Sequence, residues 1–235
     1  MPHDATNALD SKEVCKTLIK HGLLQSNKAK EILSKKDTVR KKLERERVKK
    51  KGNGVNTPVD IIDIIATYKM ARADGKSGLV DEDAIYQTLA DEWKIPFKKI
   101  DPVKLDLNLV TTTIPHNFAK NHTVLPIDIQ DGTLSVATPA PFNLVVMDDI
   151  KRVTNLKVQQ VISPRSDIVR LINEFFGFKR SIAAAEDMFS GPTVDLGNLE
   201  QYVRLKTSDD SGPTDQHIVN AVNHILLYAF EQRAS

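Results

Sequence analysis

Apolar residues recur at helical spacing through the first third of the chain. Val14, Cys15 and Leu18 share one face of a helix that we expect to end at Gly22. Ser26 can cap a second helix, whose apolar positions continue the same spacing. This part of the chain therefore predicts a helical hairpin.

Two further amphipathic helices are expected before residue 97. Thr57 is a candidate N-cap, Pro58 suits a first helical position, and the apolar run that reaches Tyr68 is typical of a buried helix. Asp81 can cap another helix, which ends before Pro96. Together these patterns predict a small helical domain over residues 11–97.

The period then changes from helical to alternating, which indicates strands. Val124–Ile129 and Thr133–Ala137 flank Asp131-Gly132, a strong signal for a β-hairpin. A helix over 142–154 and a strand over 157–162 follow. A strand, a helix and a strand in succession predict parallel pairing through a right-handed crossover.

Helices are expected on both sides of this strand region. Pro115 opens a short helix ahead of the hairpin, and Ser163 with Pro164 predicts the start of a closing helix that Gly177 ends. Residues 101–177 therefore predict a small three-stranded α/β domain. The fold class of the chain is α+β or α/β.

A charge run over residues 35–51 contains ten Lys or Arg and three Asp or Glu. Its apolar members, Val39, Leu43 and Val48, are too few for a continuous core stripe. The run is either an exposed extension of the second helix or a solvated linker, and Gly52–Gly54 breaks any helix beyond it. Its role is either that of a passive tether or that of an electrostatic docking element.

We divide the chain into five segments on these patterns. They are a helical hairpin plus basic linker (1–56), a helical part (57–100), an α/β domain (101–177), a linker (178–213) and a last helix (214–235).

Charge is distributed unevenly along the chain. Residues 1–56 hold 15 Lys or Arg against 7 Asp or Glu, and the remaining residues hold 18 against 24. The basic excess is local, which argues against a nucleic-acid surface spread over the whole protein. Cys15 is the only cysteine, which favours a reducing compartment, and no apolar run is long enough to cross a membrane.

No sequence motif supplies a convincing catalytic or metal site. Gly75-Lys76-Ser77 resembles the end of a phosphate-binding loop, but the first glycine of such a loop is replaced by Met70. The six histidines lack the i, i+4 spacing of a helical metal site. Asp148-Asp149 are better explained by a solvated helix face than by acid–base chemistry.

The order of short sequence motifs from Ile95 to Gly177 is distinctive. It runs IPF, IPxxFA, VLPI, DGTLSVAT, PFN, DDI and ISPRSDI. It resembles the N-terminal domain of the ATPases of type II secretion and type IV pilus assembly. Gln216–Ser235, with its VN and LL pairs, resembles the helix that opens the ATPase core in this family. The resemblance implies a fragment of a longer motor, whose phosphate-binding loop lies beyond Ser235.

Some members of this family bind cyclic di-GMP through a tandem motif, RLGxxLxxxGxLxxxxLxxxLxxQ. The first copy keeps Leu18, Gly22, Leu24 and Leu33, but its RLG is Glu13-Val14-Cys15 and its final Gln is Lys36. The second copy keeps Gly78, Ile85 and Leu89, but it lacks the RLG and has Glu92 in place of Gln. The positions kept are those that the core of a helical hairpin needs.

The resemblance implies a cytoplasmic adaptor that sits at the inner membrane through its partners. We expect it to dock a homo-hexameric ATPase onto the cytoplasmic domain of a membrane-anchored platform protein, with no nucleic acid and no membrane insertion. Lys41, Lys42, Lys49 and Lys50 are the expected partner-binding residues, with the first hairpin supplying apolar contacts. No cofactor is expected within these residues, whereas ATP and Mg²⁺ are implied for the parent protein. The alternative is a sensor of cyclic di-GMP built on the same domain.

Overall fold

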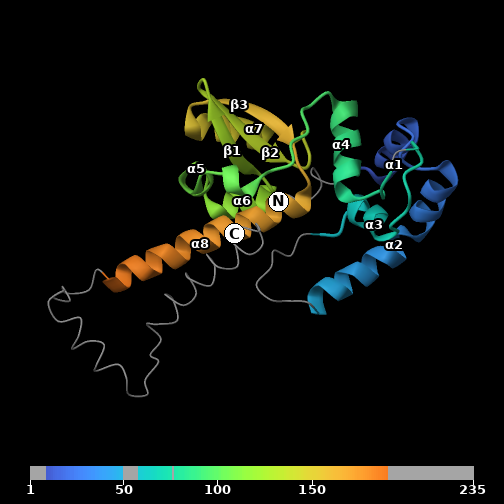
Figure 1. Ribbon diagram of the computed structural model, residues 1–235, viewed down its shortest axis with the longest axis horizontal. Helices are drawn as coiled ribbons and strands as arrows, with labels where there is room; N and C mark the ends of the chain where they lie inside the picture. Colours follow the sequence, from blue (N-terminus) through green and yellow to red (C-terminus); the bar gives the residue numbers. More distant parts are fainter. Residues whose placement is uncertain (1–8, 50–57, 76, 190–235) are drawn as a thin grey trace, which may run out of the picture. The chain divides into compact units, whose positions relative to one another are not determined.

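The computed structural model describes residues 9–49, 58–75 and 77–189 (Figure 1). The chain divides into two compact units, residues 1–173 and 174–235. The helices of the first unit start with α1 (Ser11–Lys20) and α2 (Ser26–Lys49), followed by α3 (Ile61–Thr67) and α4 (Glu82–Trp93). Their starts are locally encoded, since Asp10, Asp60 and Asp81 each accept a backbone N–H from the first turn of α1, α3 and α4. Gly22 lies just beyond α1, where its φ of +70° gives the positive dihedral that a tight turn requires.

These four helices enclose one hydrophobic core. Leu18 of α1, Ile32 of α2, Ile64 of α3 and Ile85 of α4 are all fully buried in it. Ile162, from the strand region, is buried in the same core. The predicted helical part is therefore stabilised mainly by apolar burial, which is the dominant favourable contribution to folding.

The charge run continues α2 as far as Lys49, so the helical extension is the alternative that the structure shows. Val39 and Leu43 are partly buried against the helical core, on the face that also carries Ala29 and Ile32. The spacing 29, 32, 39, 43 follows the i, i+3, i+4, i+7 rule, so these residues extend the core stripe of α2 into the charge run. Residues 50–56 lie outside the described residues.

The strand region is a three-stranded mixed sheet in the order β1-β2-β3 (Figure 1). β1 (Leu125–Gln130) pairs antiparallel with β2 (Thr133–Thr138), which pairs in parallel with β3 (Lys157–Ile162). Asp131 and Gly132 have φ values of +47° and +71°, as a two-residue turn with two left-handed positions requires. The predicted hairpin, the parallel pair and the α+β fold class are confirmed.

Short helices accompany this sheet. A 3₁₀ turn (η1, Pro102–Lys104) and α5 (Leu107–Thr112) precede α6 (His116–His122), and α7 (Leu144–Thr154) connects β2 with β3. α5 packs near β1, and α7 packs near β3. The sequence did not predict α5, because its six residues are too few for a recognisable period.

Two predicted helix limits were wrong. α3 starts at Ile61 instead of Pro58, because Asp60 and Asp63 form a reciprocal capping box that fixes the first turn there. The closing helix, α8 (Arg165–Phe189), runs through Gly177. One glycine costs a helix only about 1 kcal/mol, and the alanines at 183–185 favour its continuation.

Backbone pairing joins the segment after α4 to the end of β3. The Ile162 N–H donates to the Pro96 carbonyl at 2.8 Å, and the Lys98 N–H donates to the Ile162 carbonyl at 2.9 Å. Trp93 and Phe142 meet edge to face, with ring centroids 5.3 Å apart. Residues 57–100 and 101–177 thus touch one another, and their boundaries as separate domains stay a prediction.

Candidate functional site

The predicted partner-binding lysines lie on α2 or just beyond it. Lys41 and Lys42 are exposed, and neither forms an ion pair with another described residue. Lys50 lies outside the described residues, as does the side chain of Lys49. The testable part of the predicted site is therefore the middle of α2.

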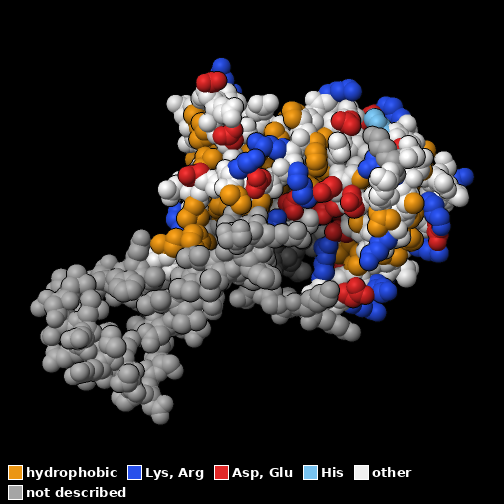
Figure 2. Space-filling view, viewed as in Figure 1, with side chains coloured by type: hydrophobic (Ala, Val, Ile, Leu, Met, Phe, Trp, Pro, Cys, Tyr) orange, Lys and Arg blue, Asp and Glu red, His pale blue; other side chains and the backbone are white. Residues whose placement is uncertain are grey.

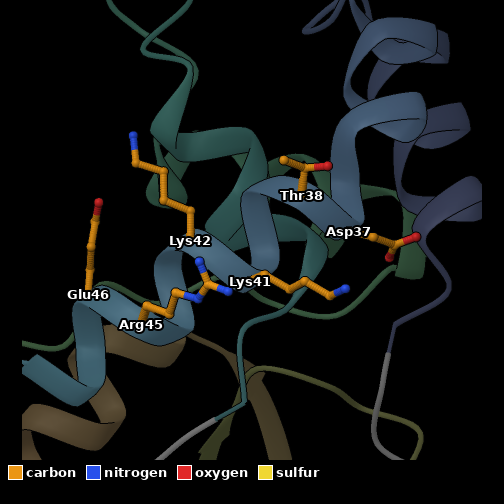
Figure 3. A pocket seen from close by; sticks show the side chains of 6 residues that line it. All are labelled: Asp37, Thr38, Lys41, Lys42, Arg45 and Glu46. Carbon is orange, nitrogen blue, oxygen red and sulfur yellow. The ribbon is translucent and has the colours of Figure 1, made fainter.

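An open hollow of about 440 Å³ lies against this stretch of α2. The described side chains that line it all come from one helix and project outward from it (Figure 3): Asp37, Thr38, Lys41, Lys42, Arg45 and Glu46. We call this surface the α2 basic face. Arg45 was not among the predicted residues, although its i, i+4 spacing from Lys41 could have revealed it.

Most of the large apolar residues of the first hairpin are buried within the chain itself. Val14, Leu18, Leu23, Leu24 and Ile32 are at most 3% exposed, because they fill the chain's own helical core. The expectation that the first hairpin supplies apolar contacts to a platform protein stays a prediction, and it now concerns the partly buried residues Ile19 and Leu33. The exposed large apolar side chains of the described residues include Phe142, Leu144 and Val145, at the start of α7.

The retained positions of the tandem motif have structural roles. Leu18, Leu24, Ile85 and Leu89 are buried in the helical core, and Gly78 has a φ of +117°. At the lost positions, Cys15 occupies the place of the motif glycine and is buried. Burial, followed by the charge of Asp10, raises the pKa of its thiol to about 11.

Glu92, in the place of the second motif glutamine, is an ion-pair partner within the chain. Its carboxylate accepts from Lys20 Nζ at 2.8 Å and meets His21 Nε2 at 2.8 Å, joining the end of α1 to the end of α4. The hydrogen bond from Lys20, and then that with His21, lowers the pKa of Glu92 to about 2. A charged carboxylate therefore occupies a position that the motif assigns to an uncharged amide.

The Gly75-Lys76-Ser77 segment lies in a turn between α3 and α4. An isolated antiparallel bridge between Ala71 and Leu79 closes the turn, and Arg72 pairs with Asp74 inside it at 2.7 Å. A phosphate-binding loop instead connects a buried strand to the N-terminus of a helix. This segment has neither neighbour, and Lys76 itself lies outside the described residues.

Membrane-spanning helices and metal sites are both absent from the part of the chain that the structure describes. No helix among residues 9–49, 58–75 and 77–189 has the length and hydropathy to cross a bilayer. Over the same residues, no three His, Cys, Asp or Glu side chains group as metal ligands.

Comparison with known proteins identifies the strand region. The MshEN domain family matches residues 93–182. The type IV pilus assembly ATPase TfpB of Acinetobacter baylyi is 27% identical over 150 residues, which are 63% of this chain and 26% of that protein. The type IV pilus assembly ATPase PilB of Myxococcus xanthus is 22% identical over 160 residues, 68% of this chain and 28% of that protein. The chain thus spans about a quarter of the length of each relative.

Two solved structures are similar to this chain at low sequence identity. One is MshE with cdg, 17% identical, covering 69% of this chain and 97% of that chain with a TM-score of 0.46. The other is the N-terminal domain of XpsE, 16% identical, covering 74% of this chain and 97% of that chain with a TM-score of 0.40.

The MshEN match over residues 93–182 contains the series of motifs that runs from Ile95 to Gly177. Together with the two pilus assembly ATPases, this match supports the identification of the chain as an N-terminal region of the secretion and type IV pilus assembly ATPase family.

Proposed function

We propose that this region is the adaptor of a cytoplasmic motor ATPase of type II secretion or type IV pilus assembly, held at the inner membrane through its partners. It docks the motor onto the cytoplasmic domain of a membrane-anchored platform protein. The observation that carries the proposal is the MshEN match beside two relatives named as pilus assembly ATPases. ATP and Mg²⁺ belong to the hexameric parent protein in this proposal, and no step of docking uses them.

The α2 basic face is the proposed docking surface. Lys41, Lys42 and Arg45 are exposed and form no ion pairs with other described residues, whereas Lys28 and Lys35 on the same helix are paired with Glu31. Unpaired exposed charges contribute little affinity each, but a cluster of them steers an acidic partner and raises the association rate. An acidic surface on the platform protein is therefore the expected counterpart.

Point variants test this surface better than a deletion does. Removing residues 1–56 would remove five large aliphatic side chains that are buried in the helical core: Val14, Leu18, Leu23, Leu24 and Ile32. Each contributes about 1.5–3 kcal/mol, so their loss is comparable with the whole stability of a domain, about 5–15 kcal/mol. A deletion would then lose binding through unfolding.

The experiment measures association of the whole chain with immobilised cytoplasmic domains of the platform protein from the same organism. The triple variant Lys41→Ala, Lys42→Ala, Arg45→Ala should associate about tenfold more slowly at low salt, with the difference shrinking at high salt.

The matched control removes three exposed lysines elsewhere: Lys104→Ala, Lys151→Ala, Lys157→Ala. Its association rate should fall much less. Equal slowing in both variants would mean that net charge alone acts, and no slowing in the α2 variant would place docking elsewhere.

The rival function, sensing cyclic di-GMP, has its own expectation. An anionic dinucleotide would meet the Glu92 carboxylate where the motif has an amide, and a buried Cys15 where it has glycine. Both changes disfavour an anionic ligand, one through like charge and one through lost backbone access.

A further inference from the structure

The first turn of α8 makes polar contacts with the starts of two helices of the helical part. Arg165 Nη1 lies 3.1 Å from Asp60 Oδ2, and it donates to the Pro58 carbonyl at 3.2 Å. The Ser166 N–H donates to Glu82 Oε1 at 3.0 Å. The first turn of α8 thereby binds residues that begin α3 and α4.

Lys99 adds a second link at the same place. Its ammonium group lies 2.7 Å from Asp167 of α8 and 2.8 Å from Asp83 of α4. Figure 2 shows acidic side chains gathered at the N-terminal end of α4, with basic side chains beside them. We call the contacts of Arg165, Ser166 and Asp167 the α8 latch.

The charged groups of the α8 latch are held at a cost in desolvation free energy. The Arg165 and Asp60 side chains are only 18% and 15% exposed, so both charges have lost most of their hydration. Burial raises the pKa of Asp60, and it also raises the pKa of Glu82. Desolvation offsets much of the attraction in such pairs, so they add little net stability.

Ile162, three residues before Arg165, makes a contact of another kind, which consists of apolar burial and backbone hydrogen bonds. Ile162 is fully buried in the helical core, and it exchanges two hydrogen bonds with the Pro96–Lys98 backbone. Apolar burial and paired backbone groups stabilise the contact of Ile162 with the helical core, and neither requires a charge to lose its hydration. The two contacts should therefore differ in the free energy needed to open them.

We propose that the α8 latch is a releasable contact. It opens from α3 and α4 while the pairing of Ile162 with the Pro96–Lys98 segment persists and the helical core stays folded. A partner that binds the open state more tightly than the closed state would shift this equilibrium, whichever surface it uses. The latch does not depend on the docking function proposed above.

Amide hydrogen exchange of the whole chain tests the latch. Arg165→Gln removes the cation from Asp60, and it should speed exchange in peptides covering residues 165–168 about tenfold or more. The reporters are the amides of Ser166, which donates to Glu82, and of Ile168, which donates to the Pro164 carbonyl. Peptides from α1 and β2 should keep their rates.

Arg152→Gln is the matched control, because it removes the same charge from α7, where the side chain is 79% exposed and pairs with Asp149 of its own helix. It should leave residues 165–168 near the original rate. Unchanged exchange at 165–168 would overturn the proposal, and so would equal acceleration of all peptides, which would show one cooperative unit.

Discussion

Replacing Ile32 by alanine tests whether α2 is part of the core or a peripheral helix. Ile32 is fully buried among the residues of the helical core. The change removes three carbon atoms, which is about 2.4 kcal/mol at about 0.8 kcal/mol for each buried methylene. The cavity that remains raises the expected loss to about 2–5 kcal/mol.

Urea unfolding followed by tryptophan fluorescence measures this loss. Trp93 is the only tryptophan of the chain and lies on α4, so its emission reports the helical core. With a slope of about 1–3 kcal/mol per molar urea, the midpoint should fall by about 1 M or more. Leu43→Ala, in the charge run and only partly buried, should lower the midpoint by a smaller amount.

Lys42→Ala is the control on the exposed face of the same helix, and it should change the free energy of unfolding by less than about 0.5 kcal/mol. Equal midpoints for Ile32→Ala and Lys42→Ala would refute the packing described for α2. An unchanged midpoint for Leu43→Ala would return the charge run to the linker alternative.

Three further predictions concern single residues. Glu92→Gln should flatten the acid dependence of the melting temperature. The folded state lowers the pKa of the Glu92 carboxyl, so this group stabilises the fold at pH values above its ordinary pKa of 4.5 and loses that contribution as the pH falls towards 2. Identical pH profiles for both proteins would contradict the ion pair. Gly132→Ala should cost about 1–2 kcal/mol in thermal unfolding, since its φ of +71° is strained for residues with a Cβ. Cys15 should resist thiol reagents at mildly alkaline pH until the protein is denatured, because it is buried and its pKa is about 11; rapid labelling of the native chain would show that α1 opens readily.

Local sequence signals were sufficient for most elements of the fold. The Asp131-Gly132 turn and the cap at Asp81 are short-range features, and each defines its element in the structure. The end of α8 could not be read in this way. Whether a helix continues past a glycine depends on the helix propensity of the residues that follow. The end expected at Gly177 took no account of the alanines beyond it.

The candidate site was predicted only in part. Lys41 and Lys42 were proposed from charge alone, because charge density is visible in the sequence, and their role in docking stays a prediction. The α8 latch was not, since Arg165 and Asp60 are 105 positions apart and only the tertiary fold brings them together. Whether the first hairpin also contacts a partner could not be decided for a similar reason, because an apolar helix face does not reveal whether it packs on its own chain or on a partner.

Calorimetric titration of the 235-residue chain tests the adaptor function most directly. The chain is titrated with the cytoplasmic domain of the platform protein and, in a separate cell, with cyclic di-GMP. We expect saturable heat with the platform domain and none with the dinucleotide at micromolar concentration. Saturable binding of cyclic di-GMP together with no binding of the platform domain would contradict the account and establish the sensor in its place.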